Sequence, residues 1–435
     1  MLFRNITLVD ENYHIQENMN VLIEEDKITY IGEDLPQNHT GETYNGQNKL
    51  LMPGFFNAHC HVPMTLLRGY GEGLPLDRWL NEKMFPFEAL LTEEDVYWGS
   101  QLGIAEMLKS GAVSFTDMYM RIAGVGKAVK ETGIKANVSF GAVAFGQEKW
   151  AQTDAYKETL ELLDYIKGIS NERMKVEASI HAEYTSNPHF IEEVVNFASD
   201  YKLSMHTHGS ESASEVKKSK ERWGLTPIEY FEKNGIFNGK TTVAHCVWLE
   251  EQDYAILKKT GATVAHCPSS NMKLASGIAP VQKMLDYGIK VAIGTDGAAS
   301  NNNLNMLEEI NLASMLQKVS CLDPLALGPK QLLGMACRNG AIAQGREDSG
   351  LIKVGNRADL IIIDLDKPHL QPIYDVLSNV IYSAQSEDIC LTMVDGKVLY
   401  QDGAYKTIDI EKVLFNVNRI KDEKLALLNS SSSMS

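Results

Sequence analysis

Two histidines, His59 and His61, stand one residue apart in the segment FFNAHCHV, where an apolar run ends. Alternate residues of a strand point to the same side, so both imidazoles can face one point. Paired imidazoles are suited to binding a divalent metal ion such as zinc. By itself the pair is weak evidence, because two histidines also fall close together by chance in loops after strands.

Further polar residues occupy equivalent places, each at the end of an apolar run. They are His181, His206, His208, His245, His266 and Asp296. Seven of the 11 histidines therefore fall at the ends of expected strands. The other four are expected on the surface, and they are His14, His39, His189 and His369.

A candidate metal site follows from this pattern. Its expected ligands are His59, His61, His208 and Asp296. Three imidazoles and one carboxylate leave room for a water molecule, whose pKa a divalent metal lowers toward neutrality. His208 is preferred to His206, because the more C-terminal residue of a strand lies nearer the open end of a barrel. We expect His206 one layer deeper, in a packing role, and assign no role to His266.

Glu211 follows His208 by three residues, in HGSE. One interpretation is a solvated glutamate at the start of a helix. The other is a general acid/base above an activated water, since a proton must be moved to the leaving group. Asp296 is a second group that can accept a proton from that water.

The elements that must bring these residues together are eight short apolar runs, most of them separated by segments with helical periodicity. The runs are MPGFFNAHCHV, AVSFTDMY, ANVSFGAVAF, KVEASIHAEY, LSMHTHGS, TVAHCVWL, ATVAHCPSS and VAIGTDGA. Apolar strands that alternate with helices indicate a parallel sheet. Eight such units predict a closed (β/α)8 TIM barrel, whose active site lies at the C-terminal ends of the strands. A doubly wound open sheet is the alternative, although no GxGxxG follows the early strands.

Both ends of the chain have β character that the middle lacks, including a hairpin signal at Asp395-Gly396. We expect residues 1–52 and 353–420 to form one small β-sandwich and residues 53–352 to form the barrel. Residues 421–435 are expected to be a polar tail, with its last residues, NSSSSMS, frayed.

The bulk composition is that of a globular protein with a net charge of −16. This charge argues against a nucleic-acid partner and favours a small-molecule ligand. Neither a secretory signal nor a membrane-spanning run is evident, and the six cysteines form no CxxC, so a cytoplasmic protein with reduced thiols is expected. Homo-oligomerisation is left open.

The motifs PGFFNAHCH, VAHC, HCPSSNMKLASGIAPV and GTDGAASNNNLNM together resemble the amidohydrolase superfamily. The similarity runs from about residue 1 to 405 and is strongest to the 5′-methylthioadenosine/S-adenosylhomocysteine deaminases of the chlorohydrolase-like group. It implies a metal-dependent barrel that replaces the amino group of an adenine ring and releases ammonia. The strand-four segment SIHAEY has no lysine, which points to the branch with a single metal ion. That ion is expected to be zinc, with iron, nickel or manganese as alternatives.

The resemblance also implies roles for residues. The ligands would be the four named above. Glu211 would protonate the ring nitrogen, and His245 would orient the attacking water. Trp79 would lie near the base or the 5′ group, Glu88 would bind the ribose hydroxyls, and His181 the purine edge. Ser300 would line the pocket floor. Without the resemblance, Trp79 reads as a partly buried helix aromatic, Glu88 as a surface charge and Ser300 as a helix cap.

One departure concerns the amino-acid end of S-adenosylhomocysteine. Relatives that take this substrate bind its carboxylate with arginines from the strand-three region, and here that region has none. Lys149 or Lys157 would serve only as point charges. We therefore expect weaker recognition of S-adenosylhomocysteine than of methylthioadenosine or adenosine. Alternatives are a deaminase or dechlorinase of another purine, a pterin or a triazine, and, less favoured, a non-catalytic barrel protein.

Overall fold

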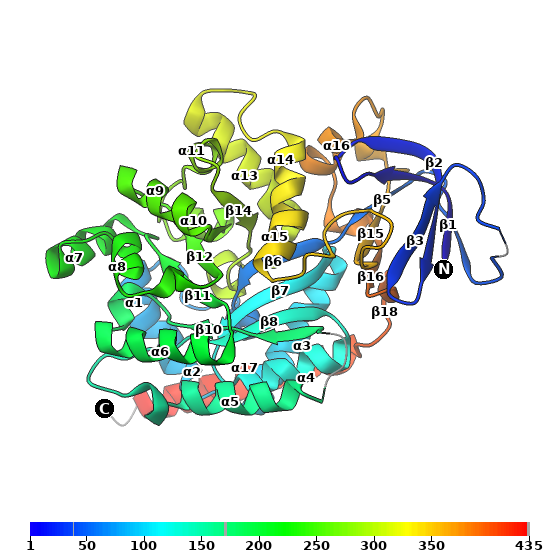
Figure 1. Cartoon of the computed structure of the whole chain (residues 1–435). Coiled ribbons are helices and arrows are strands. Elements are labelled where there is room, and N and C mark those ends of the chain that lie inside the picture. The colour runs from blue at the N-terminus through cyan, green and yellow to red at the C-terminus, as the bar shows by residue number, and fades with distance from the viewer. Residues whose placement is uncertain (38, 169–171, 433–435) are drawn as a thin grey trace.

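The middle of the chain forms a closed barrel of parallel strands (Figure 1). The computed structural model describes residues 1–37, 39–168 and 172–432. The strands are β6 (Phe55–Cys60), β7 (Ala112–Tyr119), β8 (Lys135–Phe140), β9 (Met174–Val176), β10 (Ala178–Ser179), β11 (Met205–Gly209), β12 (Thr241–His245), β13 (Thr263–His266) and β14 (Lys290–Ile293). Because β9 and β10 are separated only by Glu177, they act as one barrel strand, and each of the eight predicted runs contains one.

Two sets of strands close the barrel. One is β6-β7-β8-β9 and the other is β10-β11-β12-β13-β14. A parallel bridge between Ala142 and Ile180 joins them on one side. On the other side the amide of Asp296 donates to the carbonyl of His59 over 3.0 Å. Closure therefore places the predicted ligands of the first and last strands next to each other, and the predicted (β/α)8 fold is confirmed.

Helices surround the barrel (Figure 1). The longer ones that follow strands are α3 (Glu93–Lys109), α4 (Ile122–Thr132), α5 (Asp154–Ile166), α6 (Pro188–Tyr201), α7 (Ala213–Trp223), α8 (Pro227–Lys233), α9 (Glu251–Thr260) and α13 (Met306–Cys321). Shorter ones are α1 (Leu76–Trp79), α2 (Phe85–Glu88), α10 (Pro268–Lys273), α11 (Val281–Asp286), α12 (Ala298–Asn301), α14 (Pro329–Leu333), α15 (Gly340–Ala343) and α16 (Val376–Tyr382). Local sequence sets their ends. Thr92 and Asp95 form a capping box at the start of α3, and Gly133 ends α4 in the left-handed conformation.

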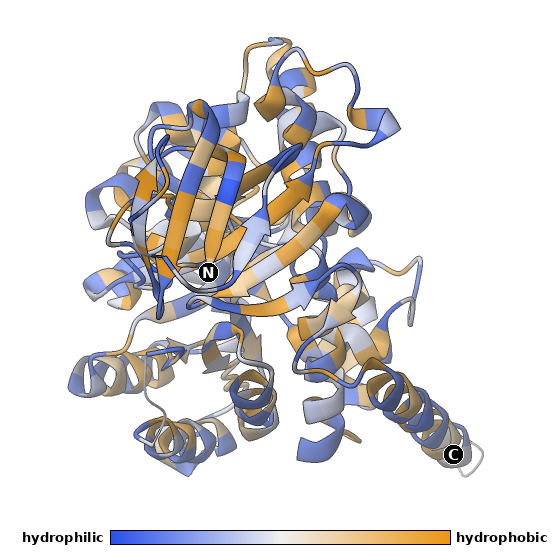
Figure 2. Cartoon of the chain, turned by 90° about the vertical axis from the view of Figure 1, so that its right-hand side faces the viewer, coloured by the Kyte–Doolittle hydropathy of each residue, from blue (hydrophilic) through white to orange (hydrophobic). Residues whose placement is uncertain are grey.

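The two ends of the chain share one nine-stranded sheet. Its strands are β1 (Leu2–Val9), β2 (Ile15–Glu24), β3 (Lys27–Gly32), β4 (Thr43–Asn45), β5 (Lys49–Pro53), β15 (Leu360–Asp364), β16 (Ile389–Val394), β17 (Lys397–Gln401) and β18 (Ala404–Tyr405). β5 joins the halves, because it pairs with β1 on one side and with β15 on the other. Side chains from both halves, including Phe3, Ile28, Ile362 and Met393, form a separate core. Figure 2 faces this sheet and shows hydrophobic and hydrophilic residues along its strands, as expected when one face is buried.

The chain ends in a long helix, α17 (Ile410–Ser432), which packs beside α3. The expectation of a polar tail from residue 421 was therefore wrong for residues 421–432. The helix continues because its apolar side chains recur at helical spacing, with Val413 and Ile420 buried. Lys424 adds an ion pair, with its Nζ 2.7 Å from Asp95 Oδ2. Residues 433–435 lie outside the described residues. Among the helices of the described chain, none has the length and apolar character needed to span a membrane.

Candidate active site

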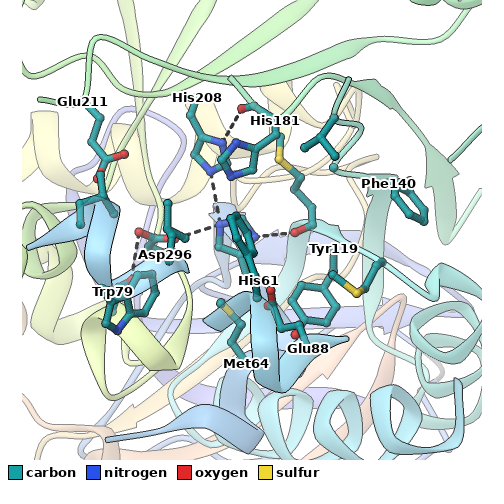
Figure 3. A pocket seen from close by; sticks show the side chains of 18 of the residues that line it. His61, Met64, Trp79, Glu88, Tyr119, Phe140, His181, His208, Glu211 and Asp296 are labelled. Atoms are coloured by element: carbon teal, nitrogen blue, oxygen red, sulfur yellow. Dashed lines mark hydrogen bonds and ion pairs between the residues drawn. The ribbon is translucent and has the colours of Figure 1, made fainter. Parts of the chain in front are cut away.

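The predicted metal ligands converge at the C-terminal mouth of the barrel, and Figure 3 shows three of them, His61, His208 and Asp296. His61 Nε2 lies 3.2 Å from Asp296 Oδ1, and His59 Nε2 lies 3.5 Å from the same oxygen. His208 Nε2 lies 3.3 Å from His61 Nε2. These four residues were predicted from their positions at the ends of strands, and the structure places their ligand atoms around one point.

The opposite ring nitrogen of each histidine is held by a neighbour outside this point. His61 Nδ1 is bonded to the carbonyl of Met118, and His208 Nδ1 to the carbonyl of His181 over 2.6 Å. A carbonyl can only accept, so both rings carry a proton on Nδ1, and in the neutral form of each ring the lone pair of Nε2 faces inward. Such outer hydrogen bonds are typical of histidines that bind metals.

His59 supplies the clearest sign of a ligand site. Its side chain is fully buried, and its Nε2 forms no hydrogen bond with any residue that the structure describes. A buried polar atom without a partner is costly, and a divalent metal would satisfy it. The donor set of three imidazoles and one carboxylate therefore fits a divalent metal ion such as zinc.

The charges at the site suit this assignment. Burial lowers the pKa of His59 and of His208 well below the ordinary value, which keeps both rings neutral. Burial would likewise lower the pKa of His61, but the Asp296 carboxylate raises it to about 9. Metal ligands must be deprotonated, so metal binding at this site would displace a proton from His61.

Asp296 is held in place from two directions. The hydroxyls of Ser270 and Ser300 donate to its Oδ2, at 2.5 and 3.2 Å. Its backbone has a φ of +60°, and that of His245 has a φ of +75°. Residues other than glycine adopt this left-handed region rarely, and such residues cluster at functional sites. The strained backbone turns both side chains toward the site.

Glu211 and His245 lie beside the metal point, and the ligand atom of His245 is within 4.8 Å of those of His59 and His208. His245 Nε2 is 3.9 Å from Glu211 Oε2 and 4.0 Å from Asp296 Oδ2. Burial raises the pKa of the Glu211 carboxyl. Glu211 is only 7% exposed, so its interpretation as a solvated glutamate at a helix start does not hold. A buried carboxyl that retains a proton more readily is suited to a general acid.

The structure adds two residues that the sequence analysis missed. Glu215, in α7, accepts hydrogen bonds from the backbone amides of Ser210 and Glu211, at 3.0 and 2.6 Å, and so holds the loop that carries Glu211. Asn271 Oδ1 lies 2.9 Å from His245 Nδ1 and orients that ring. Glu215 had a signal in the sequence, since Ser212 and Glu215 have the spacing of a capping box.

A cavity of about 500 Å³ opens from this point, and it is lined by all of the predicted substrate residues. They are Trp79, Glu88, His181, Glu211 and Ser300. Trp79 comes from α1 and Glu88 from α2, and both side chains are buried. Glu88 lies beside Tyr119 in Figure 3, and burial raises its pKa. The plain interpretation of Glu88 as a surface charge is therefore wrong, because the cavity has a carboxyl on its wall.

The outer part of the cavity is mostly apolar and has charged groups at its mouth. The apolar wall includes Leu80, Phe85, Met120, Phe140 and Phe145. Arg121, Asp154 and Glu158 also line the cavity, and Arg121 Nη1 lies 3.9 Å from Glu158 Oε1. Lys149 and Lys157 are not among the lining residues. Arg121 was not among the predicted residues, because it follows the second barrel strand rather than the third.

Another buried carboxyl, that of Glu309, holds loops of the site in place, as Glu215 does. Glu309 in α13 accepts from the amide of Ser269 over 3.0 Å and from Asn301 Nδ2 over 2.7 Å. Burial raises its pKa to about 8, from an ordinary value of 4.5. Between these two values the unfolded chain loses its proton while the folded protein keeps it, so the stability falls as pH rises.

We expect the Glu309→Gln variant to lose this pH dependence. One carboxyl contributes a slope of up to about 1.4 kcal/mol per pH unit. The free energy of unfolding from urea titrations should therefore fall less steeply in the variant than in the wild type between pH 5 and about 8. Equal slopes in the two proteins would mean that Glu309 is ionised throughout this range.

Comparisons with known proteins identify the family of this chain. A model of the amidohydrolase family matches residues 50–399. The 5-methylthioadenosine/S-adenosylhomocysteine deaminase of Dictyoglomus turgidum is 42% identical over 419 residues, which cover 96% of this chain and 97% of that protein. The enzyme of the same name from Caldanaerobacter subterraneus is 41% identical over 421 residues, with coverages of 96% and 97%.

Solved structures show the same architecture. An adenosine deaminase from Xanthomonas campestris with bound zinc is 31% identical and superposes with a TM-score of 0.92 over 98% of both chains. The atrazine chlorohydrolase TrzN of Arthrobacter aurescens, with zinc, is 22% identical with a TM-score of 0.88, over 97% of this chain and 99% of that one. At this lower identity the likeness shows the fold alone. With most of its length matched by the family model and by relatives above 40% identity, this chain belongs to the amidohydrolase family.

Proposed function

We propose that this protein is a metal-dependent deaminase that converts the adenine ring of a nucleoside to the hypoxanthine form and releases ammonia. The observation that carries the proposal is one cavity that combines a three-histidine, one-carboxylate metal site with a buried acid, Glu211, and a buried carboxyl, Glu88. The names of the relatives support the same reaction and the same substrates, methylthioadenosine, S-adenosylhomocysteine and adenosine.

Each residue has a task in this proposal. A divalent metal ion held by His59, His61, His208 and Asp296 would supply Lewis-acid activation of water, and zinc is the first candidate. Glu211 delivers a proton to the ring nitrogen next to the attacked carbon. His245, oriented by Asn271, directs the attacking water. His181 faces the purine edge, and Trp79 packs against the base or the 5′ group.

An ammonia-release assay tests the proposal. Methylthioadenosine, S-adenosylhomocysteine, adenosine, guanine and triazines are assayed with one preparation whose metal content is measured in parallel. We expect ammonia from the adenine nucleosides, loss of turnover after chelation, and recovery when metal is restored. Turnover of triazines or guanine alone would favour the alternative reactions, and no turnover with metal fully bound would favour a non-catalytic barrel.

The Glu88→Ala variant should distinguish nucleosides from free bases. Glu88 is proposed to accept hydrogen bonds from ribose hydroxyls, and a hydrogen bond to a charged group contributes about 1.5–3 kcal/mol. Steady-state kinetics should therefore show kcat/KM for adenosine reduced by about 10–100-fold, with little change for any residual activity on adenine. An equal loss for both compounds would contradict a ribose contact.

The charged mouth predicts a ranking among the nucleosides. Arg121, an arginine that lines the cavity, is already paired with the Glu158 carboxylate at 3.9 Å, which leaves it less available to bind the carboxylate of S-adenosylhomocysteine. We expect a lower kcat/KM for S-adenosylhomocysteine than for methylthioadenosine. Glu158→Gln should narrow this gap roughly fivefold, which corresponds to about 1 kcal/mol, without changing the kinetics of adenosine. A preference of the wild type for S-adenosylhomocysteine would contradict this account.

A further inference from the structure

His206 lies directly behind a metal ligand. Its side chain is fully buried, and its Nε2 is 2.8 Å from Nδ1 of His59. The two rings are stacked, with centroids 5.0 Å apart. The sequence analysis expected a packing role for His206 one layer below the mouth. The position is as expected, but the hydrogen bond to His59 goes beyond packing.

Glu177 lies behind His206 in turn, where it separates β9 from β10. Its Oε2 is 3.4 Å from His206 Nδ1. Its other oxygen, Oε1, accepts from Asn137 Nδ2 over 2.7 Å and from the Ser204 hydroxyl over 2.9 Å. Arg346 donates to Asn137 Oδ1 over 3.2 Å, which fixes the amide with its NH2 group toward Glu177. Two donors therefore hold Oε1, and Oε2 is left to face the ring of His206.

These contacts favour one arrangement of the protons. Neither His206 Nδ1 nor Glu177 Oε2 has a hydrogen-bond partner among the described residues, and a negative oxygen 3.4 Å away favours the neutral His206 tautomer with its proton on Nδ1. Its Nε2 then has a lone pair and accepts from His59 Nδ1. That leaves the lone pair of His59 on Nε2, the atom aimed at the metal point. Each step removes one of two possible tautomers.

From this chain of contacts we infer that Glu177 and His206 are positioning residues that hold His59 in its metal-binding tautomer. The inference rests on the proposed metal centre. His61 and His208 need no such aid, since their Nδ1 atoms face backbone carbonyls, which are acceptors in every state. His59 is the one ligand among the three whose outer partner is a side chain that can itself take either tautomer.

Two substitutions of His206 distinguish between its two possible roles, as a hydrogen-bond acceptor for His59 and as a packing residue. Leucine fills similar space without an acceptor, whereas glutamine offers an amide oxygen to His59 Nδ1. Loss of an outer partner typically lowers metal affinity by 10–100-fold. Titration of the purified full-length variants against a chromogenic zinc chelator should show this loss in His206→Leu and a much smaller one in His206→Gln.

Glu177→Gln tests which nitrogen of His206 carries the proton, because glutamine has nearly the same shape as glutamate but can place an NH2 group against His206. Asn137 and Ser204 would keep the amide oxygen of the new side chain, so its NH2 group would point at His206 Nδ1. His206 would then carry its proton on Nε2, against the proton of His59. We expect zinc affinity to fall by about 10–100-fold, with the melting temperature of the metal-free protein nearly unchanged.

Thr207→Val is the matched control, because it alters the neighbouring residue of the same strand and should keep wild-type zinc affinity. Wild-type affinity in both His206→Leu and Glu177→Gln would overturn the inference, and so would equal losses in His206→Leu and His206→Gln. Failure of the proposed function looks different, because the wild type itself would then bind no zinc or release no ammonia. If a variant does not fold, the histidine 15N chemical shifts of the wild-type protein test the inference instead. They report which nitrogen of His206 carries the proton, and a proton on Nε2 would overturn the inference.

Discussion

Glu211→Gln is expected to lower the rate of ammonia release by about 10²–10⁴-fold, the usual contribution of a positioned acid/base. Glutamine keeps the shape of the side chain but cannot give up a proton. Glu211 lies 3.9 Å from His245 Nε2, and burial raises its pKa. It is not one of the four proposed ligands, so the metal content should remain that of the wild type.

The experiment measures single-substrate kinetics with methylthioadenosine or adenosine and the metal content of the same preparations. Glu221→Gln is a suitable control, because it makes the same change at an exposed residue of α7, the helix that follows Glu211, outside the cavity. A Glu211→Gln variant within tenfold of the wild-type rate would show that another group moves the proton.

Lys135→Met is expected to cost about 3–5 kcal/mol of stability, because it leaves the buried Asp359 carboxylate without its lysine partner, whereas Asp395 keeps an ion pair with Arg173. Lys135 is 3% exposed, at the start of β8. Its Nζ lies 2.6 Å from Asp359 Oδ2 and 2.6 Å from Asp395 Oδ1. These aspartates belong to the C-terminal part of the chain, so the lysine ties the terminal sheet to the barrel.

Urea unfolding followed by circular dichroism measures this loss. Lys217→Met is the control, since Lys217 is exposed and its ion pair among the described residues is with its helix neighbour Glu221. It should leave the midpoint nearly unchanged. The double variant Lys135→Met/Asp359→Asn should recover part of the stability, because one buried charge is then removed together with its partner. A single variant as stable as the wild type would contradict a role for the lysine in joining the two parts.

Much of the site was predictable from the sequence, because the barrel relates position in a strand to position in space. The sequence predicts that His59, His61 and the polar residues at the ends of later strands meet at one end of the barrel. These residues share one mouth because all eight strands point the same way and their C-terminal ends meet. Trp79 and Glu88 could be predicted only from the family resemblance. They lie on short helices outside the barrel strands, so their position in the sequence does not show whether they face the active site.

Other features depended on tertiary packing. Arg121 was missed because its place in the cavity depends on how the loop after β7 leaves the barrel. The tail was misjudged because a polar sequence still forms a helix when its few apolar side chains meet α3.

The role of His206 was missed for a related reason. Strand alternation placed it one layer deep, but only the closed barrel brings His59, His206 and Glu177 from three strands into one line. Position along the strands was therefore enough to indicate which residues could bind a metal. Which ring nitrogens face the proposed metal site depends on hydrogen bonds between distant segments, because these favour one tautomer of each ring.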